Sequence, residues 1–254
     1  MRSIRVVLIG FLVATLATAG ACTNARTISR PLAGASPTPT DPVKVLVDAI
    51  HNTRATSLTF TIDIAGGGVT MLQGSGAIDA AKRRQSSRMQ EVIDGVSTLE
   101  QTVTIGNDLY VKDDDDAHWM HADATRIATM TVPTVGDLRD PTGLRSYARA
   151  VATVRRAGDG QFEGTLDFTQ PVPPDPADLG APMNLGPPGP VPFTATVDDQ
   201  HRLTSIVITV PATPGVPAAT VTVHFVDFGA PVTVEAPPAA QTVEAPKDRF
   251  PTVN

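Results

Sequence analysis

The chain has 254 residues, a formal net charge of −6 at pH 7 and one cysteine. This acidic balance argues against nucleic acid as a partner, and an aromatic content of 4% does not favour recognition of bases or sugars by stacking. A single cysteine excludes a disulfide within the chain, but the length suits one domain whose core needs no such staple. The 23 prolines, with frequent valine, alanine and threonine, are typical of a β-rich exported protein with proline-bounded loops.

Residues 1–21 have the three parts of an export signal peptide. Arg2 and Arg5 make a basic start, Val6 to Leu16 is an apolar run too short to span a bilayer, and small residues follow. Cys22 stands directly after Ala19-Gly20-Ala21, which resembles the lipobox of bacterial lipoproteins. The resemblance implies cleavage before Cys22, acylation of its thiol with chains such as palmitate, and anchoring at the extracytoplasmic face of the cell membrane. An ordinary signal peptide that a cysteine happens to follow is the alternative.

Residues 22–40 are rich in proline, glycine and serine, which predicts a lipidated tether that does not fold. A helix is expected from Pro42 to Ala55, because Asp41 is a good N-cap and proline suits the first helical position. Its apolar stripe consists of Val43, Leu46, Val47 and Ile50. We expect this stripe to lie against a sheet.

A strand is predicted from Ser57 to Ile64, where apolar and polar residues alternate. Its buried face would consist of Leu58, Phe60, Ile62 and Ile64. Glycine and Asp-Gly turns then indicate an antiparallel meander, although Gly74 and Gly76 interrupt its second strand. The further strands are expected at Val69 to Asp79, Arg83 to Ile93, Val96 to Ile105, Leu109 to Lys112 and His118 to His121.

The middle of the chain has helical signals. Asp140-Pro141 can begin a helix, and apolar residues from Leu144 to Val151 then follow helical spacing. Strands resume at Thr153 to Arg156 and at Phe162 to Phe168. One face of the second strand would present Phe162, Gly164, Leu166 and Phe168.

Nine prolines between Pro171 and Pro192 argue against any strand or helix there and predict an extended loop of the same domain. The last strands are expected at Phe193 to Val197, Leu203 to Val210 and Thr220 to Phe228. The folded domain would span residues 41–238, and residues 239–254 predict a loose C-terminal tail.

This order of elements predicts an α+β fold: a curved antiparallel half-barrel sheet with two or three helices on one face. So few helices would cover only part of a sheet of about ten strands, so we expect a concave face lined by aliphatic side chains.

Several short motifs follow the signal peptide, the first helix and the first strand in a fixed order. They are Gly106-Asn107-Asp108-Leu109-Tyr110-Val111, His118-Trp119-Met120, Val197 to Leu203, Phe225 to Val232 and Ala236-Pro237-Pro238. Together with the lipobox they resemble the LppX/LprG-type lipoproteins of mycobacteria and other actinobacteria, over nearly the whole chain after the signal peptide. The resemblance implies a half-barrel similar to LolA and LolB, with an apolar cavity for acyl chains of envelope lipids or lipoglycans. The proline-rich segment Pro171 to Pro192 departs from the family pattern, so the resemblance does not extend to the rim and size of that cavity.

The sequence has no nucleophile elbow, phosphate loop or zinc-protease motif, and the family brings no catalytic motif, so we expect neither an enzyme nor a cofactor. Gly74-Ser75-Gly76 has no neighbouring signal for a base. His118 and His121 would point to opposite sides of a strand, and Asp113 to Asp116 lack the glycine of a calcium loop. A solvated acidic loop is therefore expected instead of a metal site.

Two features leave alternatives open. Trp119 either packs against the core or sheet edge or lies at the mouth of a lipid cavity. The basic residues are either solvated strand ends or contacts for anionic headgroups. They are Lys82, Arg83, Arg84 and Arg88 in one cluster and Arg155 and Arg156 in another.

The sequence thus predicts a membrane-anchored envelope lipoprotein that binds or transports lipids or lipoglycans in an apolar cavity. The alternative is a non-catalytic scaffold or partner-binding lipoprotein with a closed core. Expected partners are membrane lipids through acylated Cys22, an acyl-chain or glycolipid ligand, and an envelope transporter. The candidate ligand-binding residues are Leu58, Phe60, Ile62, Ile64, Trp119, Phe162, Leu166 and Phe168.

Overall fold

The computed structural model describes residues 41–93, 95–124, 131–132, 136–137, 142–169, 189–213, 217–246 and 250. The predicted signal peptide, Cys22, the tether and most of the proline-rich loop lie outside these residues. The described residues all belong to one compact unit, Pro39–Asn254. Within them, no helix is long and apolar enough to cross a membrane.

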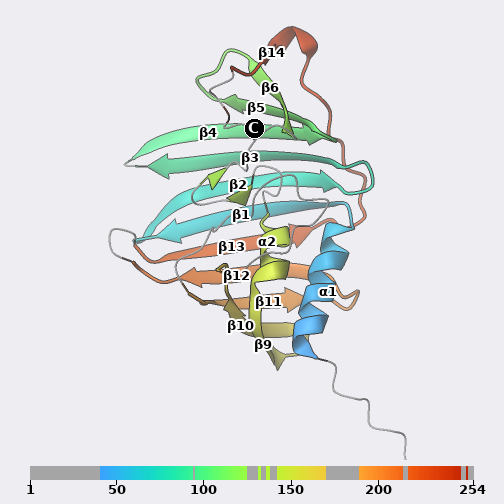
Figure 1. The fold of residues 1–254 in the computed structure, drawn as a ribbon, viewed down its shortest axis with the longest axis vertical. Coiled ribbons are helices and arrows are strands. Elements are labelled where there is room, and N and C mark those ends of the chain that lie inside the picture. Colours follow the sequence, from blue (N-terminus) through green and yellow to red (C-terminus); the bar gives the residue numbers. More distant parts are fainter. Residues whose placement is uncertain are drawn as a thin grey trace, which may run out of the picture. The chain divides into compact units, whose positions relative to one another are not determined.

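Two antiparallel meanders make up most of one twelve-stranded sheet (Figure 1). The first consists of β1 (Leu58–Gly66), β2 (Val69–Asp79), β3 (Arg84–Ile93), β4 (Val96–Ile105), β5 (Asp108–Asp113) and β6 (Trp119–Asp123). The second consists of β9 (Val151–Gly158), β10 (Gln161–Leu166), β11 (Val191–Val197), β12 (Leu203–Val210) and β13 (Ala219–Val226). A separate small sheet pairs β7 (Thr131–Val132) with β8 (Gly136–Asp137).

The two meanders join where the first strand of one meets the last strand of the other. β1 pairs antiparallel with β13, from Thr59 opposite Val226 to Gly66 opposite Ala219. One edge of the sheet is therefore β9, and at the other edge β14 (Thr242–Glu244) pairs in parallel with β6.

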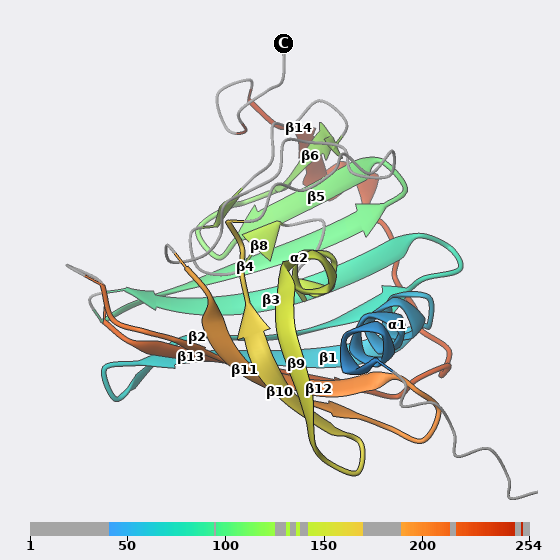
Figure 2. The same ribbon diagram turned by 60° about the horizontal axis from the view of Figure 1, so that its bottom comes forward.

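Two α-helices of the described chain lie on the same face of this sheet, which curls around them (Figure 2). We call this the inner face and the opposite one the outer face. The predicted α+β fold class, with a large curved antiparallel sheet and helices on one face, is confirmed.

Helix α1 (Pro42–Arg54) begins where the capping pattern predicts. The Asp41 carboxylate accepts a hydrogen bond from the backbone N–H of Val43 at 3.0 Å. Near the other end, the buried hydroxyl of Thr53 accepts from the N–H of Leu203 at 2.8 Å and so fastens the helix to β12. Helix α2 (Leu144–Ala150) packs beside α1.

The main hydrophobic core lies between the helices and the inner face of β1 and the second meander. The alternation predicted for β1 is confirmed: Leu58, Phe60, Ile62 and Ile64 are all buried. The largest buried side chains around them are Phe162, Phe225, Leu46, Ile50, Leu144, Leu166, Leu203 and Ile206. Three separate parts of the chain thus contribute to one core.

The interruption of the second strand predicted at Gly74 and Gly76 is wrong, because β2 runs without a break. A Cβ at Gly76 would collide with the ring of Phe60, and one at Gly74 with the sulfur of Met89. Both glycines therefore make room for neighbouring side chains of the core.

Three predicted boundaries are corrected around the second meander. Val151 begins β9 instead of ending the helix, because it pairs with Leu166 of β10. β10 ends at Leu166, so Phe168 lies after the strand. Val191 and Pro192 belong to β11, although the proline-rich segment predicts no strand; there Val191 is buried and pairs with Leu166.

The predicted loose tail is also wrong in part. Residues Ala239–Gln241 form a 3₁₀ turn, and β14 follows directly. The unpaired backbone groups of β6 provide an edge to which a short extended segment can add. The folded domain therefore continues beyond residue 238.

Candidate functional site

The predicted ligand-binding residues fall into two places. Six of them belong to the closely packed core and are at most 4% exposed; they are Leu58, Phe60, Ile62, Ile64, Phe162 and Leu166. Phe168 packs against this core with its ring edge-on to Tyr147, at 6.5 Å between centroids. Trp119 lies on β6, which β2 to β5 separate from β1, so the structure does not bring it to the others.

A bulky side chain cannot replace Gly164 without disturbing the sheet. Its position on β10 faces the backbone carbonyl of Thr153 on β9 so closely that any Cβ would collide with it. We therefore assign Gly164 to the pairing of β9 with β10, and substitution there tests folding instead of ligand binding.

The motifs behind the family resemblance hold turns together. Asp198 accepts hydrogen bonds from Arg202 through the backbone N–H at 2.9 Å and through the guanidinium at 2.7 and 2.9 Å. The Arg202 guanidinium also stacks 4.2 Å from the centre of the Phe228 ring. Asp227 accepts from the hydroxyl of Thr59 at 2.7 Å. These residues are structural in the described chain.

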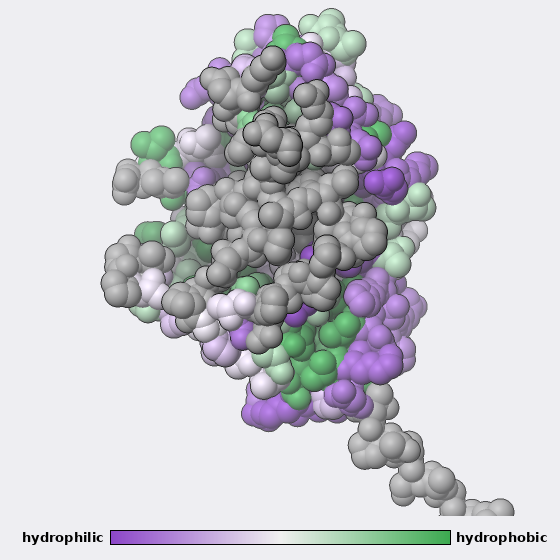
Figure 3. All heavy atoms as spheres, in the orientation of Figure 1, coloured by the Kyte–Doolittle hydropathy of each residue, from purple (hydrophilic) through white to green (hydrophobic). Residues whose placement is uncertain are grey.

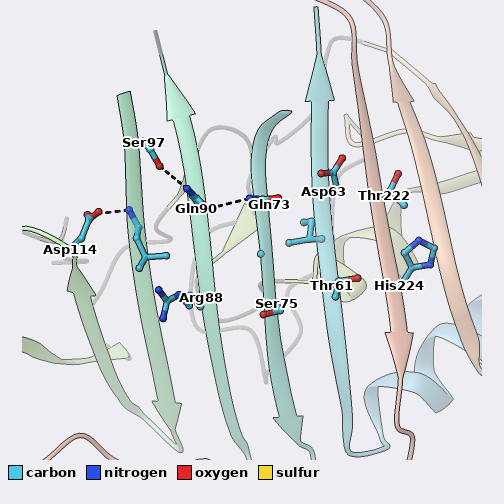
Figure 4. Close-up of a pocket in the computed structure, with 13 residues that line it drawn as sticks. Thr61, Asp63, Gln73, Ser75, Arg88, Gln90, Ser97, Asp114, Thr222 and His224 are labelled. Carbon is cyan, nitrogen blue, oxygen red and sulfur yellow. Dashed lines mark hydrogen bonds between the residues drawn. The ribbon is translucent and has the colours of Figure 1, made fainter. Parts of the chain in front are cut away.

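A polar depression of about 730 Å³ lies on the outer face, with helix α1 behind the sheet (Figure 4). Gln73 donates to Gln90 at 3.1 Å, and Gln90 donates to Ser97 at 2.9 Å, so neighbouring strands are linked by their side chains. Ser75 and His224 also line it, but they come from strands separated by β1. We regard this outer depression as a solvated sheet surface whose side chains satisfy one another.

A second cleft lies between the inner face and both helices, where β2, β3 and β4 meet the end of α1 and the start of α2. Its volume is about 440 Å³. Its lining includes Arg54 of α1, Leu144 of α2, Ile78 of β2 and Thr104 of β4. We call it the inner cleft. Leu144 is part of the main core and Ile78 packs against it, so the cleft reaches the edge of the core.

The basic cluster of the sequence divides between the two faces. Arg88 of β3 lines the outer depression, and Arg83, in the turn before β3, lines the inner cleft. Arg84 also borders the cleft, but its guanidinium donates to the Val234 carbonyl at 3.1 Å. Lys82 instead bonds the buried carboxylate of Asp79 at 2.8 Å, and this hydrogen bond lowers the pKa of Asp79. In the second basic cluster, Arg155 forms a salt bridge with Glu163. The guanidinium carbon of Arg156 lies 5.1 Å from the centre of the Phe162 ring.

His121 has partners that its local sequence does not reveal. Its two ring nitrogens lie 3.0 Å from Asp108 on β5 and 2.8 Å from Glu244 on β14. Partial burial lowers the pKa of His121, but the hydrogen bonds to these two carboxylates outweigh it and raise the pKa above its ordinary value. The side chain thus bridges β14 to the sheet. Among the described residues, no cluster of His, Cys, Asp or Glu could hold a metal ion.

The inner face also carries apolar side chains that the core does not enclose. Val210, Ala219 and Val221 lie at the ends of β12 and β13, pack against the core and remain half-buried. A separate hydrophobic area is visible next to α1 (Figure 3).

No family model and no curated protein matches this chain. Among solved structures it is similar to a LolA superfamily protein from Nitrosomonas europaea, at 10% identity and a TM-score of 0.36, over 83% of this chain and 97% of the other. It is also similar to a DUF1329 family protein from Desulfovibrio piger, at 10% identity and a TM-score of 0.31, over 76% of this chain and 96% of the other. Membership of the LppX/LprG-type family stays a prediction, and the function is inferred below from the residues.

Proposed function

We propose that the chain is an envelope lipoprotein, anchored through acylated Cys22, that binds the acyl part of a lipid or lipoglycan between its inner face and its helices. The observation that supports this most is the position of the inner cleft. It lies between the sheet and both helices, and Ile78 and Leu144 connect it to the core. An acyl chain that enters here meets apolar side chains directly.

The energetic argument is the removal of apolar surface from water. Each Å² that an acyl chain buries contributes about 25 cal/mol, so a long chain can contribute several kcal/mol before ordering costs. The partly buried Ile78 and the core residue Leu144 are the apolar side chains of the inner cleft that would gain from this contact.

The direct test is native mass spectrometry of the full chain purified from membranes. Bound lipid in a fixed ratio is the expected result. Ile78→Asn, in the inner cleft, should reduce bound lipid, while Ser75→Asn, on the outer face of the same strand, should not, with circular dichroism confirming that both fold. A protein that carries no lipid, and takes up none from a membrane lipid extract, would contradict the proposal.

The rival function is a scaffold with a closed core, and one observation favours it. Phe60, Phe162 and Phe225 are at most 1% exposed without any ligand, so this part of the interior is already filled. A scaffold would bind protein partners and no lipid in the same experiment. The predicted transporter partner stays a prediction under either function.

A further inference from the structure

The C-terminal segment contacts the edge of the sheet formed by β5 and β6 on both of its faces. β14 pairs with β6 over three residues, and the Ala245 N–H adds one hydrogen bond to the His121 carbonyl at 2.8 Å (Figure 1). So short a pairing has little stability of its own, because each residue that it orders costs backbone entropy. Side-chain contacts next to β14 therefore decide whether the segment stays attached.

One of these contacts is the His121 imidazole, which lies between two carboxylates. Its Nδ1 is 2.8 Å from Glu244 on β14, and its Nε2 is 3.0 Å from Asp108 on β5. An ionised carboxylate only accepts hydrogen bonds, whereas a neutral imidazole has a single N–H to donate. The bridge from β14 to β5 is therefore complete only when His121 carries a proton on both nitrogens.

The second contact is Phe250, which lies on the inner face of the same edge. It is 3% exposed and belongs to a small apolar cluster with Leu109 and Val111, apart from the main core. Directly paired residues share a face, and the strand register runs from Phe60 on β1 through β2, β3 and β4 to Val111. Tyr110 alternates with the two cluster residues of β5 and so faces outward.

The groups around His121 leave it as the one that changes charge near neutral pH. Partial burial lowers its pKa, but the hydrogen bonds to Asp108 and Glu244 outweigh burial and raise the pKa. The ring of Tyr110 lies 5.0 Å from the imidazole, and burial and the same two carboxylates raise the pKa of its phenol. Asp123 of β6 stands opposite Asp108 and adds a further carboxyl group to this edge.

We propose that β14 and Phe250 form a clasp on the β5–β6 edge, that His121 keeps it closed, and that it opens as pH rises. Opening would free the edge of β6 for another extended segment and uncover the apolar inner side of β5. The direction follows from the bridge, since an imidazolium donates to both carboxylates and a neutral imidazole to one. The inference stands apart from the proposed function, because release of β14 can be measured whether or not the inner face holds a lipid.

The experiment uses two reporters in the full chain, purified in a neutral detergent, from about pH 5.5 to about pH 8.5. Trp119 is the only tryptophan and pairs with Thr242 of β14, so quenching of its fluorescence by acrylamide measures exposure of this edge. Hydrogen exchange at the Ala245 amide, corrected for the intrinsic effect of pH, measures loss of its bond to His121. Exchange should accelerate about three- to tenfold over this range, a modest factor because the Glu244 side chain is 82% exposed.

Three substitutions separate the parts of the clasp. His121→Gln should abolish the pH dependence of both reporters, because glutamine does not titrate in this range. Phe250→Ala should accelerate Ala245 exchange at every pH and keep the pH dependence. His224→Gln, which removes another histidine of the outer face but on β13, is the matched control and should behave like the wild type. Circular dichroism checks that each variant folds.

Several outcomes would overturn the inference. They are a wild-type chain whose two reporters do not change with pH, a transition that persists in His121→Gln, and an equal loss of the transition in His224→Gln. Unchanged Ala245 exchange in Phe250→Ala would overturn the part assigned to Phe250. A pH-dependent clasp in a chain that binds no lipid would support the inference and count against the proposed function alone.

Discussion

Phe60 is the residue at which the packing of the inner face can be tested most sharply. Its side chain is 1% exposed, and its ring occupies the space that a side chain at Gly76 would need. Replacing Phe60 with alanine leaves a void above a glycine, so β2 has no side chain with which to fill it. Truncation of a buried phenylalanine costs about 3–5 kcal/mol, and the glycine beneath argues for the upper half of that range.

The assay is denaturant unfolding of the full chain, followed by circular dichroism. Thr61→Ala, one position along β1 and exposed on the outer face, is the control and should change the free energy of unfolding by less than about 0.5 kcal/mol. Phe60→Leu should fall between the two. A loss below about 1 kcal/mol for Phe60→Ala would refute the reasoning, because it would show that the face is soft or lined by solvent.

Three further predictions concern the anchor, the C-terminal strand and the edge of the sheet. Cys22→Ala should release the protein from the membrane fraction or leave its precursor uncleaved; a variant that fractionates and migrates like the wild type would contradict lipidation. The stability contributed by His121, whose pKa is raised, should be fully present below about pH 6.5 and be lost as pH rises through the folded-state pKa. Glu244→Gln should flatten this dependence, and an NMR titration that finds an unshifted His121 pKa would contradict it. Gly164→Ala should destabilise the chain by about 1–3 kcal/mol in thermal unfolding, since its Cβ meets the backbone of Thr153; an unchanged melting temperature would show that β9 can move aside.

Much of the fold could be predicted because its signals are local. The cap at Asp41, the alternation through β1 and the Asp-Gly turns each act within a few residues of the chain. β14 could not be predicted in this way. Three residues are too few to show the alternation of a strand, and the pairing depends on the open edge of β6 and on the hydrogen bond between His121 and Glu244.

The candidate site was less accessible to sequence reasoning for the same physical reason. The basic cluster around Arg83 was visible, but not that Arg83 lies in the turn before β3 and Arg88 on the outer face of β3. Arg54, Thr104 and Arg145 carry no local signal of a site, because separate elements bring them together. Gly74 and Gly76 indicated a weak strand, whereas their use becomes apparent only beside Phe60 and Met89.

The seam between β1 and β13 has a consequence for how the chain folds. Thr59 and Asp227, which bond across the seam, are 168 residues apart. Contacts of such long range form slowly, and the second meander must be complete before β1 gains its partner. Until then β1 presents an unpaired edge with an apolar face, which is prone to association with other chains. The intermediate is protected only once β13 is present, so truncations before residue 219 should aggregate more than truncations after residue 226.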